Sequence, residues 1–329
     1  MTTTRCLVIG IGLLIAGCTT SFANDKATPD DLRAFAERMS DRHGMDADQV
    51  MGWLQASKYQ QKIIDAITSP AESLPWHRYR GIFVKPGRIK GGARFWRKHA
   101  ELLERAEARY GIPPEVIVAI IAVETRFGRY SGGHRVIDAL RTLAFSYPKR
   151  AGFFRSELEA YLLLAEEQGF DPLEPKGSYA GAMGMPQFIA SSYRAYAVDF
   201  NGNGTTDLWD ETADAVGSVA NYLAEHGWRE GEPVVARATV TGDGWKDYDT
   251  SGLKPDTTVG KLRAAGVKLE ADYPDDSAAR LLALDGDDGT EFWVARRNFY
   301  VITRYNHSAL YSLAVHQLGE AIRERFEDR

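Results

Sequence analysis

Apolar residues in the first third of the chain recur at helical spacing. Leu32, Phe35 and Met39 lie three or four positions apart, and similar spacing continues to about residue 110. Residues 113–127 open with two prolines, as a helix can, and are then apolar nearly all round. A helix without a polar face is expected to be buried. Further helices are predicted at about 135–146, 148–168, 187–198, 212–226 and 308–326.

The pattern changes near Trp228. Three segments are strand-like, and residues 285–289 (Asp-Gly-Asp-Asp-Gly) are typical of a hairpin turn; the strand-like segments are 233–240, 280–284 and 291–294. We therefore expect a mainly α (α+β) fold with a small inserted β domain. The predicted organisation is a leader at 1–17, a tether at 18–31, an α-helical domain at 32–110, a core at 111–228, a β domain at 229–297 and a closing segment at 298–329.

The N-terminus has the features of a secretory leader. The apolar run at 7–18 is too short to span a bilayer, and it ends in Ile-Ala-Gly-Cys18, a pattern like a bacterial lipobox. We expect Cys18 to be lipidated and to anchor the protein in the outer membrane, facing the periplasm, because Thr19 follows it instead of Asp. The alternative is cleavage after Ala23, which would give a soluble periplasmic protein. Cleavage at the lipobox leaves Cys18 as the only cysteine, so no internal disulfide is possible.

Composition narrows the classes of function. The chain has 329 residues, with 40 Lys and Arg against 45 Asp and Glu, and 44% of its residues are hydrophobic. These values are typical of a globular protein with ample core-forming material. The small acidic excess argues against a nucleic-acid partner, which would require a basic face.

Glu124 is the most informative candidate for chemistry. It lies in the apolar helix, on one stripe with Ile117, Ile120 and Ile121. Burial and the negative end of the helix dipole both raise the pKa of such a carboxyl. A raised pKa suits a general acid that works near neutral pH.

Two observations leave the role of Glu124 open at this point. A structural ion pair with Arg126 or Arg129 is the alternative to catalysis. Glycosidases normally use a pair of carboxylates, and no partner is evident near Glu124. Asp138, on the following helix, is expected to cap or pair there.

Residues 176–188 are rich in glycine and other small residues. Gly177, Gly181 and Gly184 permit close backbone approach and leave Ser178 and Gln187 as polar groups beside a tight surface. The alternative is close helix packing. The segment is not a phosphate-binding loop, because the Lys-Ser/Thr ending is missing.

Residues 199–210 match the calcium-loop pattern D-x-[DN]-x-[DN]-G, with Asp in place of Glu at position twelve. We expect one structural Ca²⁺ within 199–214, with the last ligand from either of two aspartates. The candidate ligands are Asp199, Asn201, Asn203, Thr205, Asp210 and Asp214.

Taken together, these motifs resemble the B-type membrane-bound lytic murein transglycosylases. The resemblance runs from about residue 30 to the end and rests on segments 123–129, 144–150, 176–188, 199–214 and 217–223. It implies a lysozyme-like catalytic core at 111–228, flanked by the α and β domains. It also implies that catalysis needs no cofactor and that the binding partner is the glycan strand of peptidoglycan. The sequence does not indicate whether the protein has protein partners.

The resemblance also implies roles for particular residues. The family's acid matches Glu124, and its substrate-contacting residues match Tyr79, Lys149, Arg150, Ser178, Gln187, Tyr222, Tyr305 and Asn306. Lys149 stands where the family has an Arg. A single acid suffices in this family because the sugar's own C6 hydroxyl attacks C1, giving 1,6-anhydromuramoyl products without water. The alternatives are a hydrolytic muramidase and a non-catalytic peptidoglycan-binding lipoprotein.

Overall fold

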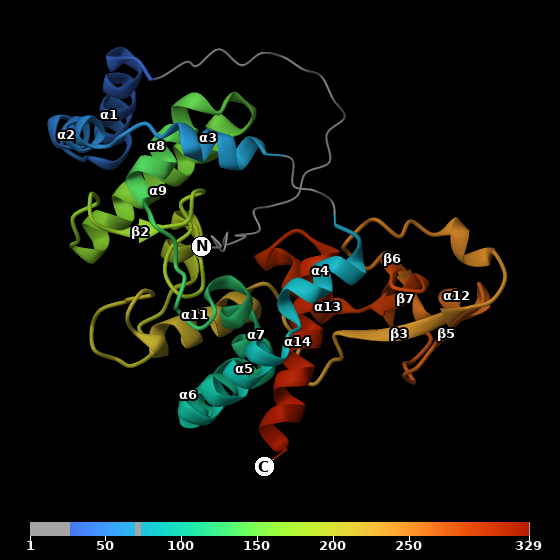
Figure 1. Cartoon of the computed structure of the whole chain (residues 1–329). Helices are drawn as coiled ribbons and strands as arrows, with labels where there is room; N and C mark the ends of the chain where they lie inside the picture. Colours follow the sequence, from blue (N-terminus) through green and yellow to red (C-terminus); the bar gives the residue numbers. More distant parts are fainter. Residues whose placement is uncertain (1–26, 70–73, 329) are drawn as a thin grey trace, which may run out of the picture. The chain divides into compact units, whose positions relative to one another are not determined.

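The computed structural model describes residues 27–69 and 74–328. The leader, Cys18 and most of the predicted tether lie outside this range. Figure 1 shows an α-rich chain that carries a small sheet between residues 235 and 295, as the sequence predicts. No helix in the described ranges is both long enough and apolar enough to cross a bilayer.

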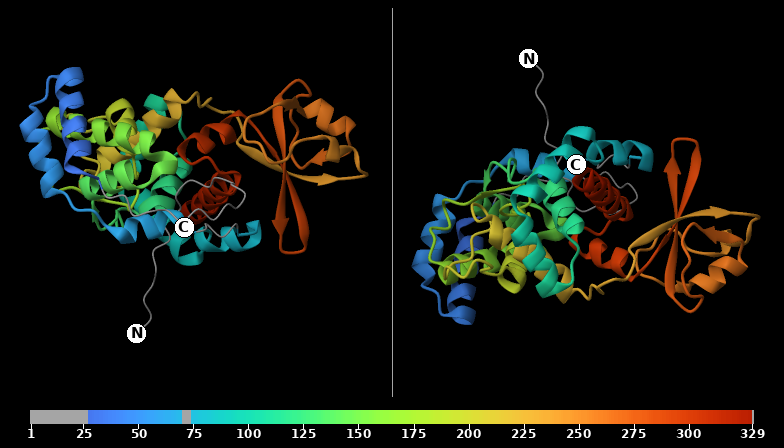
Figure 2. Two further views of the ribbon diagram at one scale, coloured as in Figure 1. Left: turned by 90° about the horizontal axis from the view of Figure 1, so that it is seen from above. Right: turned by 90° about the horizontal axis from the view of Figure 1, so that it is seen from below.

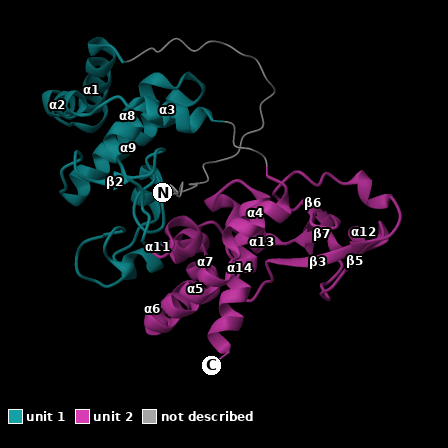
Figure 3. Ribbon diagram, in the orientation of Figure 1, with its two compact units in different colours: residues 1–71, 128–218 teal, residues 72–127, 219–329 magenta. Residues whose placement is uncertain are grey.

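The chain forms two compact units, each built from two separate stretches (Figure 3). The first consists of Met1–Ala71 and Gly128–Ser218, and the second of Glu72–Phe127 and Val219–Arg329. These divisions differ from the segments predicted to end at 110 and 228. Hydrophobic periodicity identifies each helix, but it does not indicate which helices share a core.

The first unit is helical, and its helices follow local sequence signals. Thr28 and Asp31 form a reciprocal capping box, so α1 begins at Pro29, within the predicted tether 18–31, and ends at the left-handed Gly44. Two short strands pair antiparallel, His134 with Gly177 and Arg135 with Lys176. The elements are α1 (Pro29–His43), α2 (Ala47–Ala56), α3 (Gln61–Thr68), β1 (His134–Arg135), α8 (Val136–Ser146), η1 (Pro148–Arg150), α9 (Ala151–Gln168), β2 (Lys176–Gly177), α10 (Ala190–Tyr196) and the first half of α11 (Thr212–Glu225).

The helical part of the second unit packs around α7 and α14. Residues Ile117 to Ala122 of α7 are fully buried, as predicted for a helix that is apolar all round. Gly92 of α5 lies against Ile322 of α14, where an added Cβ would come within 2.6 Å of Ile322 Cγ1. The helices are α4 (Trp76–Phe83), α5 (Pro86–Lys98), α6 (Ala100–Tyr110), α7 (Pro114–Thr125), α13 (Arg297–Tyr305) and α14 (Ala309–Glu327).

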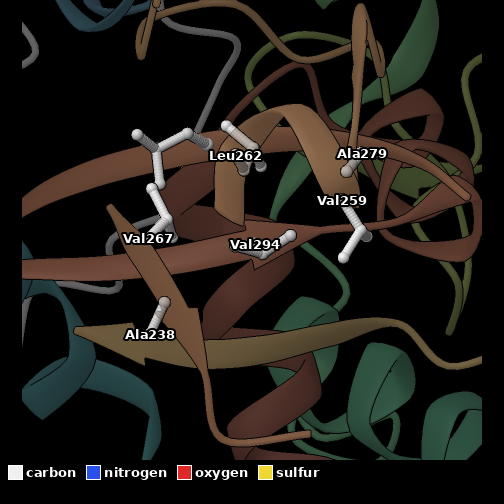
Figure 4. Packing of buried hydrophobic residues seen from close by; sticks show 7 residues of the cluster. Ala238, Val259, Leu262, Val267, Ala279 and Val294 are labelled. Carbon is white, nitrogen blue, oxygen red and sulfur yellow. The ribbon is translucent and has the colours of Figure 1, made fainter. Parts of the chain in front are cut away.

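The same unit carries a five-stranded antiparallel sheet in the order β4-β6-β7-β3-β5. The two views of Figure 2 show β6 and β7 as a long hairpin, which turns between Gly286 and Gly289 as predicted. Helix α12 packs on the sheet over a small apolar core that includes Leu262, Val267 and Val294 (Figure 4). The elements are β3 (Val235–Val240), η2 (Gly244–Asp247), β4 (Thr257–Thr258), α12 (Val259–Ala264), β5 (Val267–Leu269), β6 (Ala278–Gly286) and β7 (Gly289–Ala295).

Candidate active site around Glu124

The helix that carries Glu124 ends one residue later in an unusual backbone. Arg126 and Phe127 both have positive φ, 51° and 65°, which costs about 1–2 kcal/mol for each residue with a side chain. The Phe127 ring stacks on Phe95 of α5 at 5.3 Å between centroids and lies over Gly91, where an added Cβ would come within 2.8 Å of Phe127 Cε2. This packing fixes the end of α7 and therefore the position of Glu124.

Among the described residues, one side chain donates a hydrogen bond to the Glu124 carboxylate. The hydroxyl of Tyr311, on α14, donates to its Oε1 at 2.6 Å. Burial raises the pKa of Glu124 to about 7, against the opposing effect of this hydrogen bond. Among the described residues no cation forms an ion pair with Glu124, so the structural alternative drawn from the sequence is not seen there.

Two of the predicted substrate-contacting tyrosines lie close enough to Glu124 for its negative charge to affect their pKa. Burial, together with the negative charge of Glu124, raises the pKa of both Tyr79 and Tyr305. Both hydroxyls therefore stay protonated and able to donate at neutral pH. Together with Tyr311, which bonds the carboxyl directly, they provide neutral hydroxyl groups near Glu124.

Tyr222 and Asn306 join this group through Tyr305. The Tyr222 ring lies edge-on to Tyr305 at 5.0 Å, and its hydroxyl donates to the carbonyl of Arg304 at 2.5 Å. Asn306 is buried and follows Tyr305 at the end of α13. The second unit thus brings together Glu124 and four of its predicted companions, and it adds Tyr311, which the sequence reasoning missed.

The other predicted contacts lie in the first unit, in the glycine-rich loop. Gly184 has φ 68°, and an added Cβ would come within 2.5 Å of the Leu208 carbonyl oxygen, so no side chain fits there. Gln187 was expected at the start of a helix, yet it lies outside α10 with φ 56°. The reason is that Met183 and Phe188 pair through backbone hydrogen bonds, which closes the loop between them. Gln187 lies in this closed loop and cannot adopt helical backbone angles.

Ser178 and Gln187 both hold this loop. The buried hydroxyl of Ser178 accepts hydrogen bonds from the N–H groups of Ala180 and Ala182, at 3.2 and 3.0 Å. The Gln187 amide donates to the carbonyls of Ser131 and Gly184, at 3.1 and 2.9 Å. These bonds leave the Ser178 hydrogen and the Gln187 Oε1 for other partners.

The basic pair at 149 and 150 lies in the short helix η1. Lys149 is exposed, and the guanidinium of Arg150 lies over the Phe153 ring at 4.2 Å. Asp138 pairs as predicted, because its buried carboxylate binds the guanidinium of Arg135 and the N–H of Lys58. Asp138 is therefore a structural group of the first unit.

The predicted calcium loop has inward-facing oxygens. The Asp199 carboxylate accepts from the N–H groups of Gly202, Asn203 and Gly204, which lowers its pKa. Asn203 Oδ1 accepts from the N–H of Thr205 at 2.9 Å. These hard oxygen donors fit Ca²⁺. Within residues 27–69 and 74–328 no three Asp, Glu, His or Cys side chains cluster as a metal site, so amide and carbonyl oxygens would have to complete it.

The two candidates for the last ligand differ in their surroundings. Asp214 is fully buried, and its two oxygens accept from the N–H groups of Phe200 and Asp207, at 2.9 and 2.8 Å. Asp210 is exposed. A further carboxylate, which the sequence reasoning did not consider, belongs to Glu211, whose Oε2 accepts from Asn201 Nδ2 at 3.2 Å.

The chain is similar in sequence and in fold to known proteins. A family model for the transglycosylase SLT domain matches residues 27–320. The chain is 42% identical over 308 residues to membrane-bound lytic murein transglycosylase B of Escherichia coli (strain K12), covering 91% of this chain and 84% of that protein.

Two solved structures are similar along nearly the whole chain. The soluble lytic transglycosylase SltB1 from Pseudomonas aeruginosa has 50% identity and a TM-score of 0.86, over 89% of this chain and 99% of its own. The E. coli lytic transglycosylase Slt35 in complex with calcium has 42% identity and a TM-score of 0.83, over 90% and 93% of the two chains.

Proposed function

The chain belongs to the transglycosylase SLT-domain family and is a lytic transglycosylase that acts on peptidoglycan; from this premise we propose that Glu124 is its single catalytic acid and then base. The observation that carries the proposal is the environment of Glu124. Its half-buried carboxyl has a pKa of about 7, accepts a hydrogen bond from Tyr311, and forms no ion pair with a described residue. A carboxyl of this kind is protonated in a useful fraction of molecules at neutral pH.

In the first step Glu124 donates its proton to the glycosidic oxygen between N-acetylmuramic acid and N-acetylglucosamine. The bond from C1 to that oxygen breaks, and positive charge develops at C1. Glu124 is now ionised, and the hydroxyl of Tyr311 stabilises the new charge by the bond at 2.6 Å. The neutral hydroxyls of Tyr79 and Tyr305 orient the sugar.

In the second step the C6 hydroxyl of the muramoyl residue attacks C1. Glu124 takes the hydroxyl proton, the new C–O bond closes a 1,6-anhydro ring, and no water is consumed. An internal nucleophile carries the proximity advantage of an intramolecular reaction. It therefore needs no second carboxylate, in agreement with the absence of an acidic partner among the described neighbours of Glu124.

The remaining predicted contacts are proposed to bind the glycan strand. Asn306 and Tyr222 support Tyr305, while Gln187 Oε1 and the Ser178 hydroxyl offer groups for the sugar's N-acetyl and hydroxyl substituents. Lys149 and Arg150 are proposed to contact anionic parts of the substrate.

A structural Ca²⁺ is proposed for the 199–214 loop, held by Asp199, Asn201, Asn203, the Thr205 carbonyl and a later carboxylate. The supporting observations are the inward-facing oxygens and the calcium complex of the E. coli relative. The ion would stabilise the loop and supply no sugar chemistry. For location we propose a lipid anchor at Cys18 in the outer membrane, facing the periplasm; the words "membrane-bound" in the name of the E. coli relative support an anchor.

Digestion of purified sacculi tests the central proposal. Mass spectrometry of the released muropeptides should find 1,6-anhydromuramoyl ends, which are lighter by one water than hydrolytic products and cannot be reduced by borohydride. Reducible muramic acid ends as the main product would identify a hydrolytic muramidase. Binding to sacculi without any release would identify a non-catalytic binder.

A further inference from the structure

Residues 74–98, which include α4 and α5, form an unusually basic stretch. They contain eight Lys and Arg residues and no Asp or Glu, in a chain whose net charge is −5. Seven of these cations are exposed, and the eighth, Arg88, is half-buried. The basic residues are Arg78, Arg80, Lys85, Arg88, Lys90, Arg94, Arg97 and Lys98.

Arg88 is the member of this stretch that has a buried donor without a hydrogen-bond partner among the described residues. This donor is its Nη1. No described carboxylate forms an ion pair with Arg88. The nearby charge that acts on its guanidinium is that of another cation, Arg126. Desolvating a cation without a counter-charge costs free energy. We therefore expect Arg88 to bind an anion that comes from outside the chain.

Ring contacts connect Arg88 with Tyr79, which lies near the acid. Its guanidinium lies over the Phe83 ring at 5.0 Å from the centroid, and Phe83 packs against Tyr79 at 5.4 Å. Tyr79 in turn feels the charge of Glu124. All four residues belong to the second unit. The stack on Phe83 holds the guanidinium in one orientation, and a planar fork of donors matches a carboxylate.

Peptidoglycan supplies such an anion. Its strands carry negative charge as carboxylates on the peptide stems, which hang from the muramoyl residues that the enzyme attacks. We propose that Arg88, with Arg126 beside it, binds a stem-peptide carboxylate and makes the enzyme select peptide-bearing over peptide-free strands. This proposal rests on the proposed function in taking peptidoglycan as substrate. An anionic membrane surface fits less well, because a flat bilayer meets exposed cations, whereas Arg88 is half-buried.

The test compares two substrates, intact glycan strands and strands whose stems an amidase has removed. The measured quantity is the ratio of kcat/KM on the first to kcat/KM on the second. In Arg88→Gln this ratio should fall about tenfold, the size expected for losing one hydrogen bond between charged groups. Arg94→Gln is the matched control, since it removes the same charge from an exposed position of the same helix, and it should keep the wild-type ratio.

Salt gives a second readout that needs no variant. The wild-type ratio should fall as salt is added, because screening weakens a carboxylate–guanidinium contact. Arg88→Lys keeps the positive charge but loses the planar, bidentate guanidinium. The kcat/KM ratio of this variant should therefore lie between those of wild type and Arg88→Gln.

Several results would overturn the proposal. An unchanged ratio in Arg88→Gln would do so, and so would an equal fall in Arg94→Gln. If Arg88→Gln does not fold, the wild-type enzyme alone can overturn the proposal. It would do so if its kcat/KM ratio equals one or does not change with salt. Loss of binding to phosphatidylglycerol vesicles in Arg88→Gln with an unchanged ratio would assign the cation to a membrane instead. Product analysis by mass spectrometry is separate, so reducible products with an Arg88-dependent ratio would overturn only the reaction proposed for Glu124.

Discussion

The hydroxyl of Tyr311 donates to Oε1 of Glu124 at 2.6 Å, although the two residues are 187 positions apart in the sequence. The bond joins the end of α7 to the first turn of α14, and it stabilises the ionised form of a carboxyl that burial otherwise keeps protonated. Burial and the bond therefore act in opposite directions on one group. Their balance brings the pKa near neutrality, where a carboxyl can give and then take a proton.

Replacing Tyr311 with Phe removes this bond and leaves the ring. The pKa of Glu124 should rise further, because only burial would then act on it, so the alkaline limb of the pH–rate profile should move to higher pH. Turnover should fall at least about tenfold, the loss expected for one hydrogen bond to a charged group. Tyr161→Phe is the control, since it removes a buried hydroxyl of the first unit that donates to the Pro172 carbonyl and not to Glu124. An unmoved limb in Tyr311→Phe would contradict this account.

Glu124→Gln keeps the shape of the side chain and cannot donate a carboxyl proton. Release of muropeptides should fall by about 10²–10⁴-fold, the usual contribution of general acid catalysis, while binding to sacculi persists. Glu115→Gln is the matched control, because Glu115 lies on the same helix and burial also raises its pKa. Near-normal activity in Glu124→Gln would mean that another residue is the acid.

The pKa of Glu124 also predicts how rate and stability change with pH. The reaction starts from the protonated acid, so kcat/KM should decline as pH rises through about 7. The folded-state pKa lies above the reference value of 4.5, so the folded protein holds the proton more tightly than the unfolded chain. Stability should therefore be lost as pH rises from about 4.5 to 7.

Denaturant unfolding of wild type and Glu124→Gln at several pH values checks this sign. The two proteins should differ little below pH 4.5, and by pH 8 the variant should be more stable by up to about 3 kcal/mol. A difference that does not change with pH would show that the carboxyl is not desolvated in solution.

Local patterns predicted most of the fold, because they depend on neighbours in sequence. The isoleucine stripe before Glu124 indicated a desolvated acid on a buried helix; Ile117 to Ala122 are fully buried, and Glu124 at the end of the helix is half-buried. The Asp-Gly-Asp-Asp-Gly turn indicated the β6–β7 hairpin. The resemblance to B-type lytic transglycosylases, drawn from short motifs, is confirmed by the family match along residues 27–320.

What the sequence did not reveal depends on distant contacts. The spacing of α14 gives no sign that Tyr311 faces Glu124, because the partner comes from another helix. The helix predicted at 187–198 included Gln187, whereas the Met183–Phe188 pairing holds Gln187 in a left-handed turn before α10. The unpartnered guanidinium of Arg88 likewise became apparent only from burial in the folded chain.

Lipidation of Cys18 predicts that the wild-type protein fractionates with the outer membrane. Several acyl chains on one cysteine hold a protein firmly, whereas a single chain holds it only marginally. Cys18→Ser should therefore move the protein out of the membrane fraction. Fractionation followed by immunoblotting checks this, and a wild type that is already fully soluble in the periplasm would rule out the anchor and favour cleavage after Ala23.

Calcium should stabilise the folded chain without entering the reaction. Binding to the folded state alone adds about 2.7 kcal/mol at a free ion concentration one hundred times Kd, so Tm should rise by several degrees over the value in chelator. Asp199→Asn should abolish this rise, because it removes the carboxylate on which three loop N–H groups converge. Asp243→Asn is the control, since Asp243 is exposed and pairs with Lys246 at the surface.

Because the ion supplies no sugar chemistry, the wild-type enzyme in chelator should keep its activity at temperatures well below the lowered Tm. Equal Tm values in calcium and in chelator, with no metal found by elemental analysis, would remove the ion from the structure. Activity lost in chelator far below Tm would mean that the loop acts on the active site as well as on stability.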